Sequence, residues 1–375
     1  MLKGLTVALL YGGKSVEHAV SCRSAATMYQ RIKACGHTII PIAIDRKGQW
    51  SLQEPASDYM PSTFKQASEV IIRPGHGLWL PKEEKPLPID ICFPVTHGSG
   101  GEDGLLQGLL ELTNLPYVGC GVQASAVGMH KHLAKIVAQQ AGISVLPSYL
   151  CQAQTIQPYR DAQNPEFMKL FSAIQQKLGP SIIAKPNDGG SSVGISVLHP
   201  VSSENLWQAL HSAFRFTQTV LLEPFLQEIQ EIECAVVSTK GQIYASEAGL
   251  VVDSEHAKNH FLTYEQKYLS SQQAYIQVPA PLAQRTLLQI SEQAKIIAQS
   301  IGVQGYARVD FFYKSKTGEI WFNEINTLPG MTAQSHFPTL VQTMGYTWET
   351  VIETLLLEGF FAYNQRSVRQ VQAVE

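Results

Sequence analysis

Continuous apolar runs alternate with helical periodicity along the first third of the chain. Leu5 to Leu10 is an apolar run that ends at two glycines, as a buried parallel strand would. Apolar positions recur at helical spacing from about Ser15 to Gly36, and further apolar runs span Thr38 to Ile44 and Ile89 to Val95. Strands whose carboxyl ends open into glycine loops are typical of a doubly wound sheet with a ligand crevice. The pattern predicts an N-terminal α/β domain over residues 1–121.

The remaining pattern predicts two more domains. Residues 122–222 combine a helix with short strands around a glycine–serine loop, which predicts a small α+β domain with a polar surface insertion at 152–165. Residues 223–375 begin with two strands joined at Lys240 and Gly241 and contain a long amphipathic helix. The polar, tyrosine-containing segment 253–277 is a candidate lid, and the polar end of the chain is predicted to be frayed.

Bulk composition restricts the class of protein. The chain has 375 residues, too many for one simple core, of which 45% are hydrophobic and 16% charged. A net charge of -3 gives no electrostatic reason to expect nucleic acid or an anionic membrane as a partner, and no apolar stretch approaches the roughly 20 residues that span a bilayer. The 6 cysteines lack metal-ligand spacing and predict reduced thiols. We therefore expect a cytoplasmic enzyme that acts on small molecules.

A polar set near the C-terminus carries the strongest chemical signal. Glu324 and Asn326 are two residues apart in a strand-like run, so their side chains point to the same face. Asp310 lies in the preceding apolar run, and the turn residues at 316–318 predict that the two runs pair as an antiparallel hairpin. Two carboxylates and an amide then converge, which suits Mg²⁺, because this ion binds few protein oxygens and leaves positions for water and phosphates. The alternative, a solvated polar strand face, does not account for the TLPGMT turn and the serine that follow.

A glycine–serine loop supplies a second signal. The run KPNDGGSSVG, from Lys185 to Gly194, follows a strand-like segment. Small residues allow backbone N–H groups to approach an anion, and the lysine adds a positive charge for a nucleotide phosphate. The spacing differs from that of the Walker motif, which disfavours an ordinary P-loop fold. Considered by itself, the run also fits a flexible surface loop.

Weaker signals lie elsewhere in the chain. Glu223 and Glu231 flank an apolar connector and fit the adenine and ribose of a nucleotide, although such a cluster alone is typical of a solvated strand edge. Glu17 stands in the first turn of a predicted helix, where it fits either a substrate ammonium group or a helix-stabilising carboxylate. His97 precedes a glycine run and has a catalytic and a structural interpretation. Arg308 shares a face with the carboxylate two residues after it and is placed to neutralise a transferred phosphoryl group.

Six motifs, in this order, resemble the D-alanine–D-alanine ligases of the ATP-grasp superfamily. They are GGKSVEHAVS, HGSGGEDG, KPNDGGSSVG, YEQKYLS, GYARVDFF and NEINTLPGMT, and the resemblance spans about residues 5–359. It implies an α/β fold in which an N-terminal Rossmann-like (pre-ATP-grasp) domain precedes a two-subdomain ATP-grasp fold. It also implies a two-step reaction. The carboxylate of one D-alanine attacks the γ-phosphate of ATP to give D-alanyl phosphate, and the amine of a second D-alanine then displaces the phosphate.

The resemblance also implies roles for individual residues. Catalytic and substrate-binding roles fall on Glu17, His97, Ser191, Tyr268, Arg308, Gly330 and Ser335. Contacts to ATP fall on Lys131, Lys185, Gly190, Ser191, Ser192, Glu223, Glu231 and Lys267. Two Mg²⁺ ions, replaceable by Mn²⁺, are expected on Asp310, Glu324 and Asn326. A lid is expected over the site because an acyl phosphate hydrolyses in water.

The chain departs from the family pattern at two positions, and alternative functions stay open. Thr263 replaces an aspartate that is frequent in the lid, and His130 replaces the aspartate that usually precedes Lys131. A ligase that makes D-alanyl-D-lactate is one alternative, which Tyr268 disfavours, and another carboxylate–amine ligase is a second. A non-catalytic nucleotide sensor is a third, which we would expect to lack the metal ligands or Arg308. The resemblance further suggests a homodimer.

Overall fold

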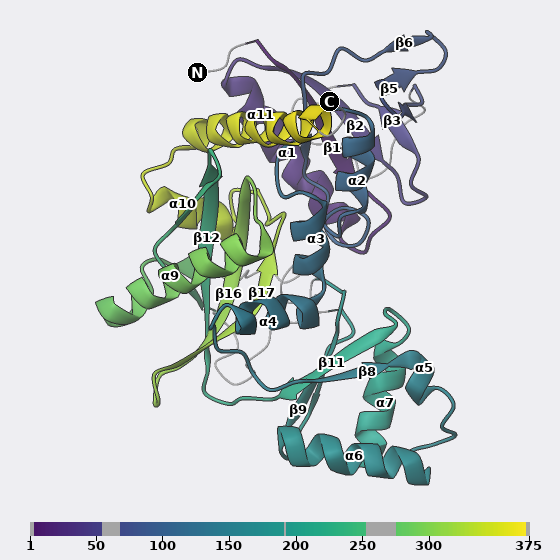
Figure 1. Cartoon of the computed structure of the whole chain (residues 1–375), viewed down its shortest axis with the longest axis vertical. Helices are drawn as coiled ribbons and strands as arrows, with labels where there is room; N and C mark the ends of the chain where they lie inside the picture. Colours follow the sequence, from purple (N-terminus) through teal and green to yellow (C-terminus); the bar gives the residue numbers. More distant parts are fainter. Residues whose placement is uncertain (1–3, 55–67, 191–192, 253–274, 373–375) are drawn as a thin grey trace.

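The chain folds into three sheet-centred units, which Figure 1 shows following one another along the long axis of the molecule. The computed structural model describes residues 4–54, 68–190, 193–252 and 275–372. In Figure 1 the N-terminal unit is at the top, the unit built by the C-terminal part of the chain is in the middle, and the central segment of the chain forms the unit at the bottom. Within the described residues, no helix has the length and apolar character that crossing a membrane requires.

Parallel strands form the core of the N-terminal unit. β1 (Thr6–Gly12) pairs in parallel with β2 (Thr38–Ile44) and β7 (Ile91–Pro94), and β3 (Trp50–Leu52) adds an antiparallel edge. α1 (His18–Ala34) packs on this sheet through Cys22, Met28 and Ile32. The other elements of the unit are β4 (Ile71–Arg73), β5 (Gly77–Leu80), β6 (Lys85–Pro86) and α2 (Leu105–Leu112). The parallel sheet predicted from the apolar runs is confirmed.

An antiparallel sheet covered by two helices forms the central unit. The strands follow the order β10-β9-β11-β8, with bounds β8 (Tyr149–Gln152), β9 (Ile182–Pro186), β10 (Ser196–Leu198) and β11 (Thr219–Pro224). α6 (Pro165–Leu178) and α7 (Ser203–Ala213) pack against it, with Phe167 and Leu206 fully buried. Asn164 begins α6 by accepting hydrogen bonds from two backbone N–H groups of its first turn. The stretch predicted as a surface insertion contains a short helix, α5 (Ala153–Ile156).

A larger antiparallel sheet forms the C-terminal unit. Its strands are β12 (Gln230–Thr239), β13 (Gln242–Ala245), β14 (Gly249–Val252), β15 (Tyr275–Gln277), β16 (Tyr306–Lys314) and β17 (Glu319–Asn326). Lys240 and Gly241 join β12 to β13 with φ angles of 52° and 78°. Both residues thus have the left-handed backbone conformation that a tight hairpin turn requires. α9 (Gln284–Ile301) covers this sheet through Ile290, Ala294 and Ile297. The predicted hairpins and amphipathic helix are confirmed.

Two helices that precede the central unit belong to the core of the C-terminal unit. α3 (Val122–Met129) and α4 (Lys131–Gln140) were assigned to the central unit by the predicted boundary at residue 122. In the structure, however, Ala124, Ala134 and Ala138 pack with Ile290 and Phe322. The helices return to a sheet that forms much later in the chain, and such a long-range contact leaves no local signal in the sequence. α4 therefore connects the two units that flank the cavity described below.

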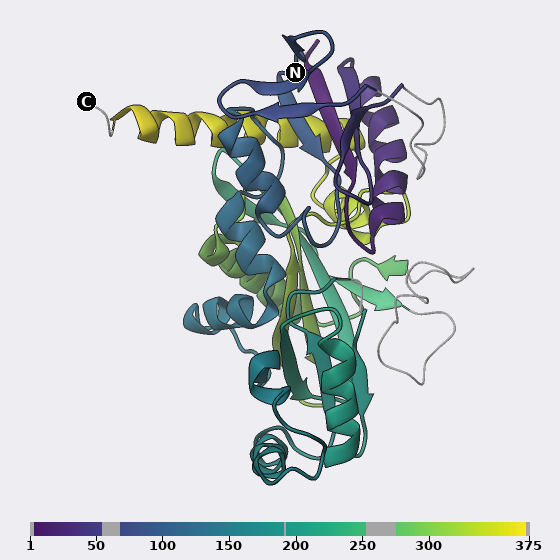
Figure 2. The same cartoon turned by 90° about the vertical axis from the view of Figure 1, so that its right-hand side faces the viewer.

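The C-terminal helices join the C-terminal unit to the N-terminal one. α10 (His336–Gln342) and α11 (Trp348–Gln372) share an apolar core with β1 and α1, in which Val351 and Leu355 pack near Leu9. Figure 2 shows α11, in yellow, running across the purple N-terminal unit. The predicted frayed tail is wrong as far as Gln372, because α11 continues to that residue. The guanidinium carbon of Arg366 lies 4.8 Å from the centre of the Tyr117 ring, which holds the end of this helix on the N-terminal unit.

Candidate active site

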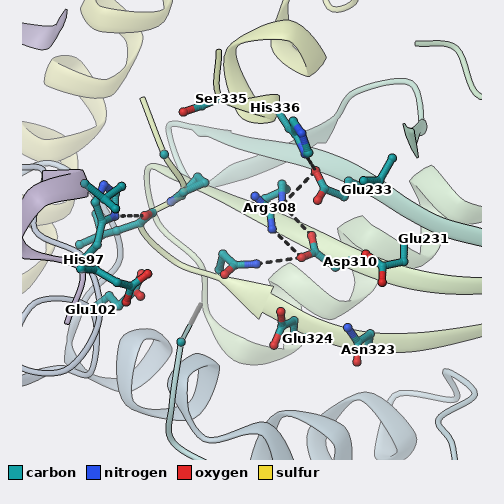
Figure 3. A pocket seen from close by; sticks show the side chains of 18 of the residues that line it. His97, Glu102, Glu231, Glu233, Arg308, Asp310, Asn323, Glu324, Ser335 and His336 are labelled. Carbon is teal, nitrogen blue, oxygen red and sulfur yellow. Dashed lines mark hydrogen bonds and ion pairs between the residues drawn. The ribbon is translucent and has the colours of Figure 1, made fainter. Parts of the chain in front are cut away.

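A cavity of about 360 Å³ opens where the three units meet, and each unit contributes part of its wall. The N-terminal unit contributes Glu17, just before α1, and His97, after β7. The central unit contributes Lys185 on β9 and the glycine loop that follows it. The C-terminal unit contributes residues of β12, β16 and β17 and the segment 328–336 (Figure 3). Polar groups that are far apart in the sequence therefore face one cavity.

Asp310 and Glu324 lie opposite each other in the β16–β17 hairpin. They are partners in the antiparallel ladder, as are Arg308 and Asn326, and all four line the cavity. The ladder shifts register after Asp310, a bulge of the kind that redirects side chains next to binding sites. The hairpin and the shared face predicted from the sequence are confirmed.

This donor set fits a divalent cation that takes few protein ligands. Burial raises the pKa of Asp310 to about 7; Arg308 opposes this effect, and the Glu233 carboxylate adds to it. A nearby cation stabilises the charged form of carboxylates that lie close together. The part of the chain that the structure describes holds no group of three or more His, Cys, Asp or Glu placed to bind a metal. The two carboxylates and the Asn326 amide are oxygen donors of the kind that suit a divalent cation, whose remaining positions water or phosphate can fill.

Arg308 is held between two carboxylates. Its Nε lies 3.2 Å from Glu233 Oε2, and Nε and Nη2 donate to Asp310 at 2.8 and 2.7 Å. His336 Nδ1 lies 2.8 Å from the same Glu233 oxygen, so one carboxylate joins β12, β16 and the first residue of α10 (Figure 3). Although burial acts against the charged form, Asp310 and Glu233 raise the pKa of Arg308 well above its ordinary value. A permanent, oriented positive charge therefore faces the cavity.

Glu223 lies in a buried cluster with two lysines. Its Oε2 is 2.9 Å from Lys185 Nζ and its Oε1 is 2.8 Å from Lys135 Nζ, and Glu223 has no exposed surface. Burial disfavours the charged carboxylate, but the two ammonium groups lower the pKa of Glu223 to about 2. Lys185 also donates to Asn323 Oδ1 at 3.3 Å. Lys185 lines the cavity, as the sequence suggested, whereas the Glu223 carboxylate faces the lysines, and Glu231 is on the cavity wall.

Lys131 joins the glycine loop to the proposed metal ligands. Its Nζ donates to the backbone oxygen of Gly189 at 2.6 Å and lies 3.2 Å from Glu324 Oε2. Lys131 begins α4, so this helix delivers a cation to the space between the central and C-terminal units. The geometry suits a lysine that contacts a phosphate next to a metal ion.

Glu17 packs against two glycines from different units. A Cβ added to Gly190, on the glycine loop after β9, would lie 2.8 Å from Glu17 Oε2, and one added to Gly98 would also collide with this oxygen. Ser15 Oγ accepts from the Glu17 N–H at 2.9 Å and donates to the His97 carbonyl at 2.7 Å. Because both glycines lack a side chain, the Glu17 carboxylate can lie next to the glycine loop after β9.

His97 is buried between the N-terminal unit and the segment after β17. Its Nδ1 lies 3.2 Å from the Leu328 carbonyl, which only accepts, so Nδ1 carries the proton and Nε2 accepts from Ser24 Oγ at 3.0 Å. Burial, opposed by this carbonyl and reinforced by Arg23, lowers the pKa of His97 to about 4. Both ring nitrogens thus hold the wall of the cavity together.

Gly330 and Ser335 form the end of the cavity nearest α10. A Cβ at Gly330 would lie 2.7 Å from Ser335 Oγ, so the glycine backbone and the hydroxyl are neighbours. Ser335 Oγ also accepts from the Thr332 N–H at 3.1 Å, which fixes its position. The other predicted site residues, Ser191, Ser192, Lys267 and Tyr268, lie outside the described residues, as do residues 253–274 of the predicted lid. The last three residues of the predicted lid form β15.

The structure adds site residues that the sequence did not single out. They are Glu102, Asn323 and His336 on the cavity wall and Lys135 behind it, whereas Glu233, which also lines the cavity, belongs to the acidic run already noted around Glu231. Burial and then the Glu17 carboxylate raise the pKa of Glu102 to about 8. Glu102 belongs to the quoted HGSGGEDG motif and Lys135 follows Lys131 by one helical turn, so both had a detectable signal. His336 had none, because only the tertiary fold places it against Glu233.

Comparison with known proteins gives a consistent result over the whole chain. The family model described as D-ala D-ala ligase N-terminus matches residues 6–120, and that described as D-ala D-ala ligase C-terminus matches residues 137–357. The D-alanine--D-alanine ligase of Acetivibrio thermocellus is 34% identical over an alignment of 380 positions, which covers 96% of this chain and 96% of that protein.

Solved structures give the same fold. The D-alanine-D-alanine ligase from Coxiella burnetii matches with a TM-score of 0.80 and 28% identity over 99% of this chain and 100% of that one. The VanG D-Ala:D-Ser ligase from Enterococcus faecalis matches with a TM-score of 0.78 and 28% identity over 95% of this chain and 100% of that one.

Proposed function

The chain belongs to the D-alanine–D-alanine ligase family, and from this premise we propose that it joins two D-alanines at the expense of ATP. Members of this family use ATP and a divalent metal ion. In the first step an oxygen of the donor carboxylate bonds to the γ-phosphorus and ADP leaves. In the second step the acceptor amine bonds to the carbonyl carbon, loses a proton, and phosphate leaves. The product, D-alanyl-D-alanine, is a precursor for peptidoglycan.

Glu17 is the proposed group for the donor D-alanine. Its buried carboxylate lies on the cavity wall against the loop of Gly189 and Gly190. A D-alanine whose ammonium group binds this carboxylate would have its own carboxylate close to that loop. His97 sits beside it as a neutral imidazole that holds Leu328 in place. We propose that Ser191 and Tyr268 link to Glu17 and help to orient this substrate. Orientation is the main contribution that a protein makes to phosphoryl transfer.

ATP is proposed to lie between the central and C-terminal units. Lys131 and Lys185 are cations on the cavity wall next to the loop of Gly189 and Gly190, which suits contacts to phosphate oxygens. Glu231 lines the cavity, and we propose that it binds a ribose hydroxyl. Glu223 is proposed from the sequence as an adenine contact, and in the structure its carboxylate forms an ion pair with Lys185. The roles of Ser192 and Lys267 in phosphate binding are part of the same proposal.

Asp310, Glu324 and Asn326 are proposed to hold two Mg²⁺ ions, for which Mn²⁺ can substitute. Bound there, divalent cations neutralise negative charge on the phosphate oxygens. The Arg308 guanidinium, fixed by Asp310 and Glu233, adds a positive charge next to this position. Arg308 and Gly330 both line the cavity, and we propose that the guanidinium and the Gly330 N–H stabilise the oxyanion that forms when the amine attacks the carbonyl. Ser335, beside Gly330, is proposed to hold the carboxylate of the acceptor.

One observation carries this proposal: the Glu17 carboxylate, the Lys131 and Lys185 ammonium groups and the Arg308–Asp310 pair line the same cavity from three units. The test is phosphate release from Mg·ATP with D-alanine, with L-alanine, with D-alanine plus D-serine, or with D-alanine plus D-lactate, with the products identified by mass. Release in every mixture that contains D-alanine, none with L-alanine, and D-alanyl-D-alanine as the main product are expected. ATP binding without release in any mixture would overturn the ligase and favour the non-catalytic nucleotide sensor.

The acceptor defines the second candidate function. D-serine is included because the solved relative from Enterococcus faecalis is described as a D-Ala:D-Ser ligase. D-lactate would give an ester. Its hydroxyl group carries no ammonium proton that must first be lost, so the rate of ester formation should depend less on pH than the rate of dipeptide formation. A mixed product that outcompetes the D-alanine dipeptide would assign the chain to one of these ligases. The same experiment therefore separates the three acceptors.

We also propose that the enzyme works as a homodimer in the cytoplasm, where ATP is its co-substrate. Exposed apolar residues on neighbouring helices support an interface between copies: Leu105 and Leu112 on α2 are 69% and 64% exposed, and Val122 begins α3. Sedimentation equilibrium tests the dimer, and a concentration-independent monomer would exclude it.

A further inference from the structure

The start of α4 is held by an asparagine that lies far away in the sequence. The Lys131 N–H donates to the backbone oxygen of Asn187 at 2.9 Å, and the next N–H, of His132, donates to Asn187 Oδ1 at 2.9 Å. A third N–H of this first turn, of Leu133, donates to His130 Nδ1 at 3.2 Å. These are groups that a helix cannot satisfy by itself, so Asn187 supplies two of the missing acceptors.

Asn187 is also fixed to its own sheet. It has no exposed surface, its N–H donates to the Thr219 carbonyl at 3.0 Å, and its Nδ2 donates to Thr219 Oγ1 at 3.1 Å. Nδ2 also lies 2.7 Å from Nε2 of His130. The residue directly follows β9, which ends at Pro186 and carries Lys185. The side chain therefore joins the end of β9 to the beginning of α4.

Both elements that meet at Asn187 carry cations of the site. α4 begins with Lys131 and includes Lys135, whereas β9 includes Lys185. α4 packs on the C-terminal sheet, while β9 belongs to the sheet of the central unit. The relative position of Lys131 and Lys185 therefore depends on how α4 is attached to the central unit. The hydrogen bonds of Asn187 make that attachment next to Lys131.

We propose that Asn187 is a positioning residue for ATP binding, which sets the place of Lys131 relative to the phosphate loop. This inference rests on the proposed function, because it takes Lys131 as a phosphate contact. Asn187 itself has no contact with the nucleotide in this proposal and acts through the helix. Its side chain is consequently expected to matter for ATP and not for the binding of D-alanine.

The test is the equilibrium affinity for ATP in the presence of Mg²⁺ and without D-alanine, measured by calorimetry. Asn187→Leu is close in size and lacks the hydrogen bonds, and we expect it to weaken ATP binding about tenfold, or about 1.4 kcal/mol. Asn187→Asp keeps an acceptor for the His132 N–H and should lose less. Ser246→Ala is the control, because Ser246 is also buried and its hydroxyl bonds to the backbone of Ala235 and Glu247 in the C-terminal unit.

A double-mutant cycle separates positioning from general destabilisation. In a Lys131→Ala background, Asn187→Leu should weaken ATP binding less than twofold, because the group that it positions is missing. An equal loss in both backgrounds, or no loss in either, would overturn the inference. If the wild-type chain failed to bind ATP, the proposed function would fall, and this inference with it. Wild-type binding with equal loss in both backgrounds would remove the inference alone.

Discussion

Arg308 and Asp310 lie two residues apart on β16 and form a two-point ion pair, with Nε 2.8 Å from Oδ1 and Nη2 2.7 Å from Oδ2. Asn326 Nδ2 donates to the same carboxylate at 3.0 Å, and Glu233 contacts the guanidinium from the neighbouring strand. The arginine is therefore held in one orientation before any substrate enters. Such preorganisation costs no rearrangement when negative charge develops in the reaction.

Replacing Arg308 by lysine tests this orientation. Lysine keeps the charge but cannot make the planar two-point contact, so we expect kcat to fall about 100-fold. The affinity for ATP should change little, because the proposed phosphate contacts are Lys131 and Lys185 and not Arg308. Steady-state kinetics and calorimetry measure the two quantities. Arg285→Lys, on the exposed side of α9, is the matched control. A kcat close to that of wild type would remove Arg308 from the catalytic set.

Local patterns predicted the part of the site that lies on one hairpin. The two-residue spacing of Glu324 and Asn326 and the turn before β17 determine which side chains share a face, and the ladder pairs Asp310 with Glu324 accordingly. No information beyond strand periodicity and turn chemistry was needed. The parallel strands of the N-terminal unit were predicted for the same reason, since each is a short apolar run that ends at a loop.

Contacts between units could not be predicted in this way. Glu233 reaches Arg308 because β12 pairs with β16, and His336 reaches Glu233 because α10 is placed over β12. Glu223 meets Lys135 because a helix before the central unit packs on the C-terminal sheet. Each contact depends on how distant elements pack together, and sequences with the same local pattern of apolar and polar residues can pack in other ways. Residues that act through such contacts carry no periodic signal.

Glu324→Gln should nearly abolish turnover. The substitution removes a negative charge that the proposal shares between two cations, while the side chain keeps its size, so we expect a loss of at least about 100-fold in kcat and a higher Mg²⁺ requirement. Titration of the rate with Mg²⁺ at saturating ATP measures both. Glu319→Gln, on the same strand but exposed, is the control and should behave as wild type. A Glu324→Gln enzyme with an unchanged Mg²⁺ requirement would contradict the metal assignment.

Lys135→Met should move acid unfolding to higher pH. Lys135 and Lys185 together keep the pKa of Glu223 at about 2, below the value of 4.5 of an unperturbed glutamate. Because the folded pKa is the lower one, Glu223 contributes stability that is complete above pH 4.5 and is lost as the pH falls towards 2. Without Lys135 the folded pKa rises and this stability disappears at a higher pH.

The same substitution should also destabilise the protein at neutral pH by about 3 kcal/mol, because it breaks a buried pair. Urea unfolding at pH 7 and acid titration followed by circular dichroism measure the two effects. Lys169→Met is the control, since Lys169 pairs with Glu166 on an exposed helix surface, and neither quantity should change. Equal behaviour of the two variants would show that the buried cluster does not stabilise the fold.

His97→Gln should reduce the pH dependence of stability. Burial keeps the pKa of His97 at about 4 in the folded chain, compared with 6.5 for an unperturbed histidine. As the pH falls from 6.5 to 4 the unfolded chain therefore binds a proton that the folded chain does not, so this group lowers the free energy of unfolding by up to about 3 kcal/mol. Glutamine can serve both Leu328 and Ser24 without titrating. Urea unfolding at pH 7 and pH 4.5 should show a smaller difference for His97→Gln than for wild type, whereas His76→Gln, at an exposed position, should keep the full difference. Identical pH dependence in all three proteins would mean that His97 titrates in the folded state.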